Sequence, residues 1–162
     1  MTTYVKEDFL YDANLVLEDS LDSAGDVSAI VASQAGKVLD VAKVVDLGDG
    51  LVEGYMIVDL DAIDVDEADE SYFIKLQASN VAAFATAGLV RDIARIDLGA
   101  GELLANATAT TGDQGAAGDR YVVPFRNVIN GVVFRYVRAY LLIADGTGET
   151  ITTTIWLSIN RK

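Results

Sequence analysis

The chain has 162 residues, neither histidine nor cysteine, a net charge of −13 and a hydrophobic fraction of 51%. The missing residue types exclude a Ser-His-Asp triad, a thiol nucleophile and a thiolate metal site, so we expect a protein that is not an enzyme. The acidic excess argues against nucleic acid as a partner, because phosphate binding needs clustered Lys and Arg.

A chain of this length fits one domain with one substantial core. High hydrophobicity combined with high charge predicts that apolar surface is buried between copies, while acidic faces keep the assembly in solution. An alanine- and valine-rich sandwich with an acidic rim is the alternative interpretation. Neither a signal peptide nor an apolar run of about 18 residues is visible, so we expect no membrane partner.

The charge is divided unevenly along the chain. Residues 1–70 contain 18 acidic residues and 3 lysines, a net charge of −15, whereas residues 71–162 contain 9 basic and 7 acidic residues, a net charge of +2. Head-to-tail contacts between copies would use this asymmetry. A solvated acidic face that happens to come first in the sequence accounts for it equally well.

The first 36 residues predict an extended N-terminal arm, because apolar and acidic residues alternate there without a compact pattern. The segment Asn14-Leu15-Val16-Leu17-Glu18 is a first short strand or the end of this arm. Residues 37–162 then form the predicted sandwich domain. The boundary follows a stretch rich in Ser, Asp, Ala and Gly.

After the arm, apolar residues recur mostly at every second position, which is typical of strands. Pro124 cannot donate a ladder hydrogen bond, so its strand is expected at a sheet edge or with a bulge. One or two helical turns could hide in residues 81–89. The pattern predicts an all-β fold, an antiparallel β-sandwich or jelly roll of about eight strands. The strands expected after the first are 38–46, 51–60, 71–79, 90–98, 120–125, 133–144 and 150–159.

Seven carboxylates crowd into residues 59–70. Calcium prefers six to eight oxygen ligands, but no glycine occupies the sixth position of a calcium loop that starts at Asp59 or Asp61. A solvated acidic connection fits better. We therefore expect no metal site and no cofactor.

The longest predicted strand carries the candidate interface. Arg135 and Arg138 fall on opposite faces of it, and Tyr136 and Tyr140 share the face of Arg138, where stacking is plausible. Arg, Tyr and Trp dominate interface energies, so these residues are candidate anchors; an intrachain buried ion pair is the alternative. Trp156 lies on a strand face of Thr and Ser, where we expect it to be partly exposed or packed under the loop at 105–118. The predicted interface residues are Tyr4, Phe9, Tyr11, Arg135, Tyr136, Arg138, Tyr140 and Trp156.

An ordered set of motifs extends over most of residues 11–159. It comprises Tyr11-Asp12-Ala13-Asn14, Val-Asp-Leu-Gly at 45–48, Tyr72-Phe73-Ile74-Lys75-Leu76-Gln77-Ala78-Ser79, Arg135-Tyr136-Val137-Arg138-Ala139-Tyr140 and a closing Ile-Thr-Thr-Thr-Ile-Trp-Leu strand. This set resembles the cement, or decoration, proteins of tailed-bacteriophage capsids. The chain departs from that pattern in the acidic insertion at 61–70 and in Ala139, where a larger residue is common.

The resemblance implies a jelly-roll or β-sandwich protein that binds the outer surface of a capsid and ties neighbouring capsomers together. The expected partners are the major capsid protein and further copies of the chain, as a homotrimer in preference to a dimer. The expected location is the virion exterior, after synthesis in the host cytoplasm. A carbohydrate-binding jelly-roll module and a sandwich associated with a phage tail or baseplate are the alternatives.

Deletion of residues 1–12 should weaken capsid binding and leave the fold intact, because an arm gains its affinity by ordering on a partner. Co-sedimentation with capsids measures the binding, and the thermal midpoint of unfolding measures the fold. A deletion variant that binds capsids like the full chain would remove the arm from the interface.

Overall fold

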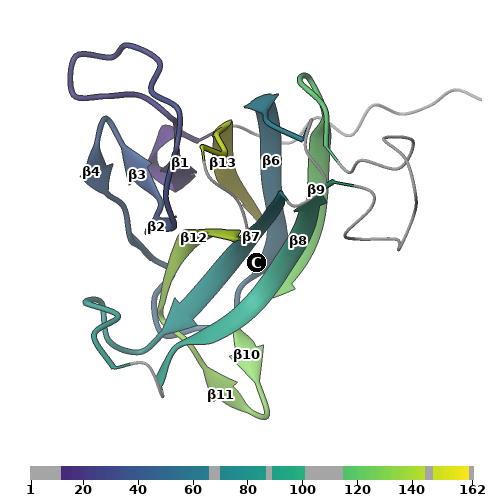
Figure 1. The fold of residues 1–162 in the computed structure, drawn as a ribbon. Coiled ribbons are helices and arrows are strands. Elements are labelled where there is room, and N and C mark those ends of the chain that lie inside the picture. The colour runs from purple at the N-terminus through teal and green to yellow at the C-terminus, as the bar shows by residue number, and fades with distance from the viewer. Residues whose placement is uncertain (1–11, 66–69, 87–88, 101–114, 145–147, 161–162) are drawn as a thin grey trace, which may run out of the picture.

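The computed structural model describes residues 12–65, 70–86, 89–100, 115–144 and 148–160. These residues form two antiparallel sheets that face each other across a shared core, as the alternating pattern predicts (Figure 1). The described part of the chain contains strands and one short 3-10 turn, η1 (Ala13–Leu15), but no α-helix. The predicted all-β sandwich is therefore confirmed.

Each main sheet has four strands in its hydrogen-bonded path. The first sheet has the order β1 (Val16–Glu18), β13 (Ile151–Asn160), β6 (Glu53–Ile63) and β9 (Arg120–Arg126). The second has the order β2 (Gln34–Ala35), β12 (Tyr136–Ala144), β7 (Ser71–Ser79) and β8 (Arg91–Gly99), and β5 (Val45–Asp46) also pairs with β12. The chain passes repeatedly from one sheet to the other, and this order is compatible with a jelly roll.

Two small hairpins complete the described strands. One consists of β3 (Lys37–Val38) and β4 (Val41–Ala42), and the other of β10 (Val128–Ile129) and β11 (Val132–Val133). In Figure 1 the second hairpin lies at the bottom of the molecule. Its residues Ile129 and Val132 line a hollow at this end of the sandwich.

The core lies between the sheets and follows the period-two pattern of the strands. In β7, Tyr72, Ile74, Leu76 and Ala78 are buried and belong to the main apolar cluster, as predicted. In β13, Ile155 and Leu157 join the same cluster. Burial of such side chains is the main source of stability in a domain of this kind.

The strand predicted at 38–46 is broken into three pieces. Leu39 and Asp40 have positive φ values of 50° and 61°, so the chain reverses there and pairs β3 with β4. Asn130 and Gly131 do the same between β10 and β11, so the strand expected from residue 133 begins at Tyr136. No helix forms in the described part of 81–89, where Phe84 adopts a positive φ.

Much of the described part of residues 12–36 packs into the sandwich, although residues 23–29 form an exposed loop that projects beyond the sheets (Figure 1). Leu17 in β1 is fully buried, Ile30 is buried beside Ile151, and β2 pairs with β12. Residues 1–11, the rest of the expected arm, lie outside the described residues. The described sandwich therefore begins close to Val16, about twenty residues before the expected boundary.

Gly36 lies between β1 of the first sheet and β12 of the second, where no side chain fits. A side chain there would place its Cβ 2.3 Å from the carbonyl oxygen of Leu17 and 2.9 Å from the Cβ of Ala139. The first contact is with backbone and cannot move aside. Gly36 thus allows β1 of one sheet and β12 of the other to meet.

The placement of Pro124 confirms the edge expected from its missing N–H. Its strand, β9, ends the first sheet and pairs only with β6 among the described strands. The strand β8 ends the second sheet in the same way. The sandwich is therefore open on the side between β8 and β9.

Asn127 follows β9 and is fully buried. Its side-chain oxygen accepts the N–H of Val52 at 2.8 Å, and its amide nitrogen donates to the carbonyls of Gly50 at 3.0 Å and Phe134 at 2.9 Å. Backbone hydrogen bonds with Val52 and Phe134 accompany them. One side chain thus joins the segments that precede β6, follow β9 and precede β12.

Asn127→Ala should lower the free energy of unfolding by about 2–4 kcal/mol, because it leaves one buried N–H and two carbonyls without their partner. Urea unfolding followed by circular dichroism measures the change. The control is Asn14→Ala at an exposed position, which should stay within about 0.5 kcal/mol of the wild type. An equal, small effect in both variants would show that the Asn127 network carries little stability.

Candidate interaction surfaces

Three of the predicted interface residues lie together on the outer face of the second sheet. Along β12, Val137, Ala139 and Leu141 point into the core, whereas Tyr136, Arg138 and Tyr140 are half-buried on the outer side. Arg138 stands opposite Gln77 and Tyr140 opposite Lys75. We call this surface the cationic face. It comprises Phe73, Lys75, Gln77, Phe84, Arg95, Tyr136, Arg138 and Tyr140.

Arg138 is the centre of the cationic face. Its Nε and Nη2 donate to Oε1 of Gln77 at 3.1 and 2.9 Å, and its guanidinium lies 4.4 Å from the ring centre of Phe84 and 5.5 Å from that of Tyr140. Burial lowers the pKa of Arg138. Among the described residues no carboxylate lies within 4 Å of it, so its charge is held by an amide and two rings.

Phe84 contributes to this site from a loop. Its φ of 50° is left-handed, a conformation that costs a bulky residue about 1–3 kcal/mol. The ring is buried against the Arg138 guanidinium. Tyr140 was predicted from the sequence as a stacking partner of Arg138, but Phe84 was not, because strand periodicity gives no information about a loop residue.

The other cations of the face have carboxylate partners. Lys75 lies 3.2 Å from Asp92, and Arg95 pairs with Asp97 while its guanidinium covers the ring of Phe73 at 4.5 Å. The Arg95–Asp97 pair is largely solvated and contributes little to stability, whereas the Lys75 side chain is mostly buried. Arg138 therefore differs from its neighbours in having no anionic partner in the described part of the chain.

Arg135 lies away from this centre. It donates to Asp46 at 2.8 Å and approaches Asp49 at 3.3 Å, and its guanidinium lies 5.3 Å from the ring centre of Tyr136. These hydrogen bonds hold the pKa of Asp46 below its usual value. The alternative prediction for this strand was a buried ion pair within the chain. Arg135 does form an ion pair within the chain, but the pair lies at the surface.

Trp156 belongs to the opposite sheet. Its exposed fraction is 4%, so the expectation of a partly exposed ring was wrong. It packs with Val16, Ile57 and Val38 on the outer side of the first sheet, and the Arg120 guanidinium lies 5.2 Å from its ring centre. This second apolar cluster was not predicted, because the neighbours of Trp156 along β13 are polar and the apolar residues that bury it come from β1, β3 and β6.

Three further predicted interface residues cannot be placed. Tyr4, Phe9 and Tyr11 lie outside the described residues. The expected interface thus divides into a group of three on the cationic face, Arg135 at its margin, Trp156 on the other sheet and these three aromatic residues.

The lower end of the sandwich exposes apolar side chains. Leu51, Leu89 and Val132 are 59%, 52% and 50% exposed. A hollow of about 300 Å³ joins Leu89 and Val132 to Ile129, and Ile129 also lines a larger cleft beside Leu51. We call this surface the apolar end. It comprises Leu51, Leu89, Val128, Ile129 and Val132.

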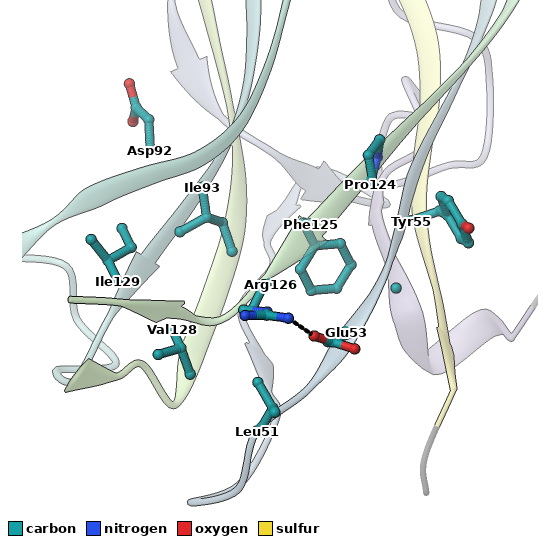
Figure 2. Close-up of a pocket in the computed structure, with 11 residues that line it drawn as sticks. Leu51, Glu53, Tyr55, Asp92, Ile93, Pro124, Phe125, Arg126, Val128 and Ile129 are labelled. Carbon is teal, nitrogen blue, oxygen red and sulfur yellow. Dashed lines mark ion pairs between the residues drawn. The ribbon is translucent and has the colours of Figure 1, made fainter. Parts of the chain in front are cut away.

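The larger cleft has a volume of about 790 Å³ and lies where the sandwich is open between β8 and β9. Figure 2 shows Phe125, Ile93 and Ile129 among the residues that line it, together with the Glu53–Arg126 ion pair. Tyr55 also lines this region but is turned away from Phe125. An apolar floor with a polar rim suits an apolar side chain or an extended peptide of a partner.

The acidic connection is only partly described. Asp59 forms a bidentate pair with Arg120, and residues 66–69 lie outside the described residues. Where the chain is described, no three carboxylates gather in an arrangement that could hold a metal ion. Within the same residues, no helix is long and apolar enough to cross a membrane.

Comparison with known proteins leaves the family of the chain open. Scans of the sequence against protein-family models and against curated proteins return no match. The function must therefore be argued from the surfaces themselves and from the resemblance of the motifs.

Arg135→Ala should raise the pKa of Asp46 towards its ordinary value, because Arg135 is the main cause of its lowering. A lowered carboxyl pKa gives stability above the unfolded-state pKa that is lost as the pH falls through the folded-state pKa. The variant should accordingly lose less stability than the wild type on acidification. Titration of the Asp46 carboxyl by NMR tests this, and an unchanged pKa would contradict the ion pair.

Proposed function

We propose that the chain is a structural, non-enzymatic protein that binds the outer surface of a phage capsid and cements neighbouring copies of the major capsid protein. Its place would be the virion exterior, and it would act as a homo-oligomer, a trimer in preference to a dimer. The ordered motifs that resemble cement proteins supply the identity of the partner. The surfaces support a protein that binds other proteins.

The observation that carries the proposal is the apolar end. Three large apolar side chains are at least half exposed there: Leu51 lines the cleft of about 790 Å³, and Leu89 and Val132 line the hollow of about 300 Å³. Contiguous exposed apolar surface with a polar rim is typical of protein interaction sites. We assign this end to the capsid shell.

The cationic face supplies a second, separate surface. Arginine and aromatic residues are the types that dominate interface energies, and here they occur together on a strongly acidic chain. A cement protein needs two surfaces, because it must bind the shell and also link its own copies. Neither surface requires a catalytic group.

The carbohydrate-binding alternative depends on exposed aromatic platforms. Trp156 is too deeply buried to serve as one. Phe73 and Phe84 lie beneath guanidinium groups, which occupy the ring faces that a sugar would use. A tail or baseplate protein would share the fold and the apolar end, and differs only in partner.

Val132→Asp should abolish co-sedimentation of the chain with emptied capsids of the phage whose genome encodes it, because a charge in an apolar contact cannot be desolvated cheaply. Val41→Asp is the matched control, since Val41 is exposed on the β3–β4 hairpin away from the apolar end. Wild-type and control chains should bind alike.

Two outcomes would contradict this proposal. A wild-type chain that stays in the supernatant with these emptied capsids is not a cement protein. Equal binding by Val132→Asp and the wild type would remove the apolar end from the shell contact. A positive glycan screen of the non-binding wild-type chain would instead favour the carbohydrate alternative.

A further inference from the structure

A protruding segment, residues 21–31, stands apart from the surfaces described so far. We call it the tongue. Asp22 accepts hydrogen bonds from the N–H groups of Ala24 at 2.8 Å and Asp26 at 3.0 Å, and Leu21 forms a bridge with Val27. Gly25, with a φ of 86°, makes the turn. These contacts give the tongue a defined shape before it meets any partner.

The tongue presents apolar and acidic side chains to solvent. Val27 and Val31 are 75% and 68% exposed, and Val27 is the most exposed large apolar residue in the described chain. Asp26 lies beside Val27, and its carboxylate has no hydrogen bond or ion pair with any described residue. Ile30 anchors the tongue in the core, whereas the side chains of Asp26, Val27 and Val31 are left exposed for a partner.

The cationic face has the complementary composition. Arg138 is half-buried, lacks a carboxylate among the described residues and is flanked by the rings of Phe84 and Tyr140. A guanidinium can hold a carboxylate with two parallel hydrogen bonds, and the aromatic rings offer apolar surface beside it. The face therefore fits a segment that combines a carboxylate with aliphatic side chains.

The tongue and the cationic face of one copy do not meet. In Figure 1 the purple-to-blue loop projects beyond the sheets on the side of β1 to β4, whereas β12 and β7 lie in the body of the sandwich. A contact between them must therefore join two copies. Such a contact is head-to-tail, and repeated with rotation it closes a ring.

We propose that the tongue of one copy docks on the cationic face of the next, with Asp26 paired to Arg138 and Val27 against the aromatic rings. The occupant is a second copy because the chain carries both complementary charges. This inference refines the self-association that the proposed function uses. It does not depend on the capsid as partner.

The test is the mass of the purified full-length chain by light scattering over a range of concentrations. Arg138→Glu and Asp26→Lys should each weaken self-association at least about tenfold, which corresponds to about 1.4 kcal/mol. The double variant, with both charges reversed, should restore it. Salt should weaken the wild-type assembly, since the contact joins two opposite charges, of which Asp26 is exposed before docking.

Controls separate loss of contact from loss of fold. Asp61→Lys reverses another exposed charge outside the tongue and should leave the mass unchanged. Asp26→Lys keeps the inference testable if Arg138→Glu unfolds, because Asp26 is exposed and holds the tongue only through its backbone. Circular dichroism of each variant monitors the fold.

Three results would overturn the inference: a monomeric wild type at its highest soluble concentration, an unchanged mass of Asp26→Lys, or a folded double variant without recovery. A chain that binds capsids as a monomer would overturn the docking contact alone. A chain that forms tongue-dependent oligomers but ignores capsids would overturn the proposed function alone.

Discussion

The buried amide of Asn127 fixes the end of the sandwich on which both candidate surfaces depend. Its three side-chain hydrogen bonds join Val52, Gly50 and Phe134, which lie on separate segments. Inside a protein such bonds are costly to break and specify one geometry. They hold the base of the β10–β11 hairpin, which carries the apolar end, and the start of β12, which carries the cationic face.

The two surfaces differ in the kind of contact that they favour. The apolar end presents aliphatic groups and an open cleft, so its affinity would come mainly from burial of apolar area. The cationic face presents paired charges and one arginine without a carboxylate partner among the described residues, so it would contribute orientation and selectivity more than raw affinity. Strong, non-directional attachment at one surface and directional contact at the other would suit the capsid-binding role that we propose.

The sequence predicted a strand correctly where the alternation of buried and exposed residues within that strand was enough to identify it. The alternation of Tyr72, Ile74, Leu76 and Ala78 predicted β7 with its bounds, and the same rule placed Tyr136, Arg138 and Tyr140 on one face. It failed where the decisive partner is distant in sequence. Trp156 is buried by Val16 and Ile57, and two of the three side-chain partners of Asn127, Val52 and Gly50, lie 75 and 77 residues away along the chain. The break at Leu39 and Asp40 was missed because their left-handed backbone lacks the usual glycine.

The position of β13 between β1 and β6 has a consequence for how the chain folds. Val16 pairs with Trp156 across 140 residues, and β1 has β13 as its partner in the first sheet. Sheets closed by such distant pairings form slowly, because the entropy cost of closing a long loop comes before the stabilising contacts form. During synthesis β1 and the edge of β6 that pairs with β13 would stay unpaired until residues 151–160 leave the ribosome. These two strand edges can therefore pair wrongly, with each other or with other chains, until β13 has been made.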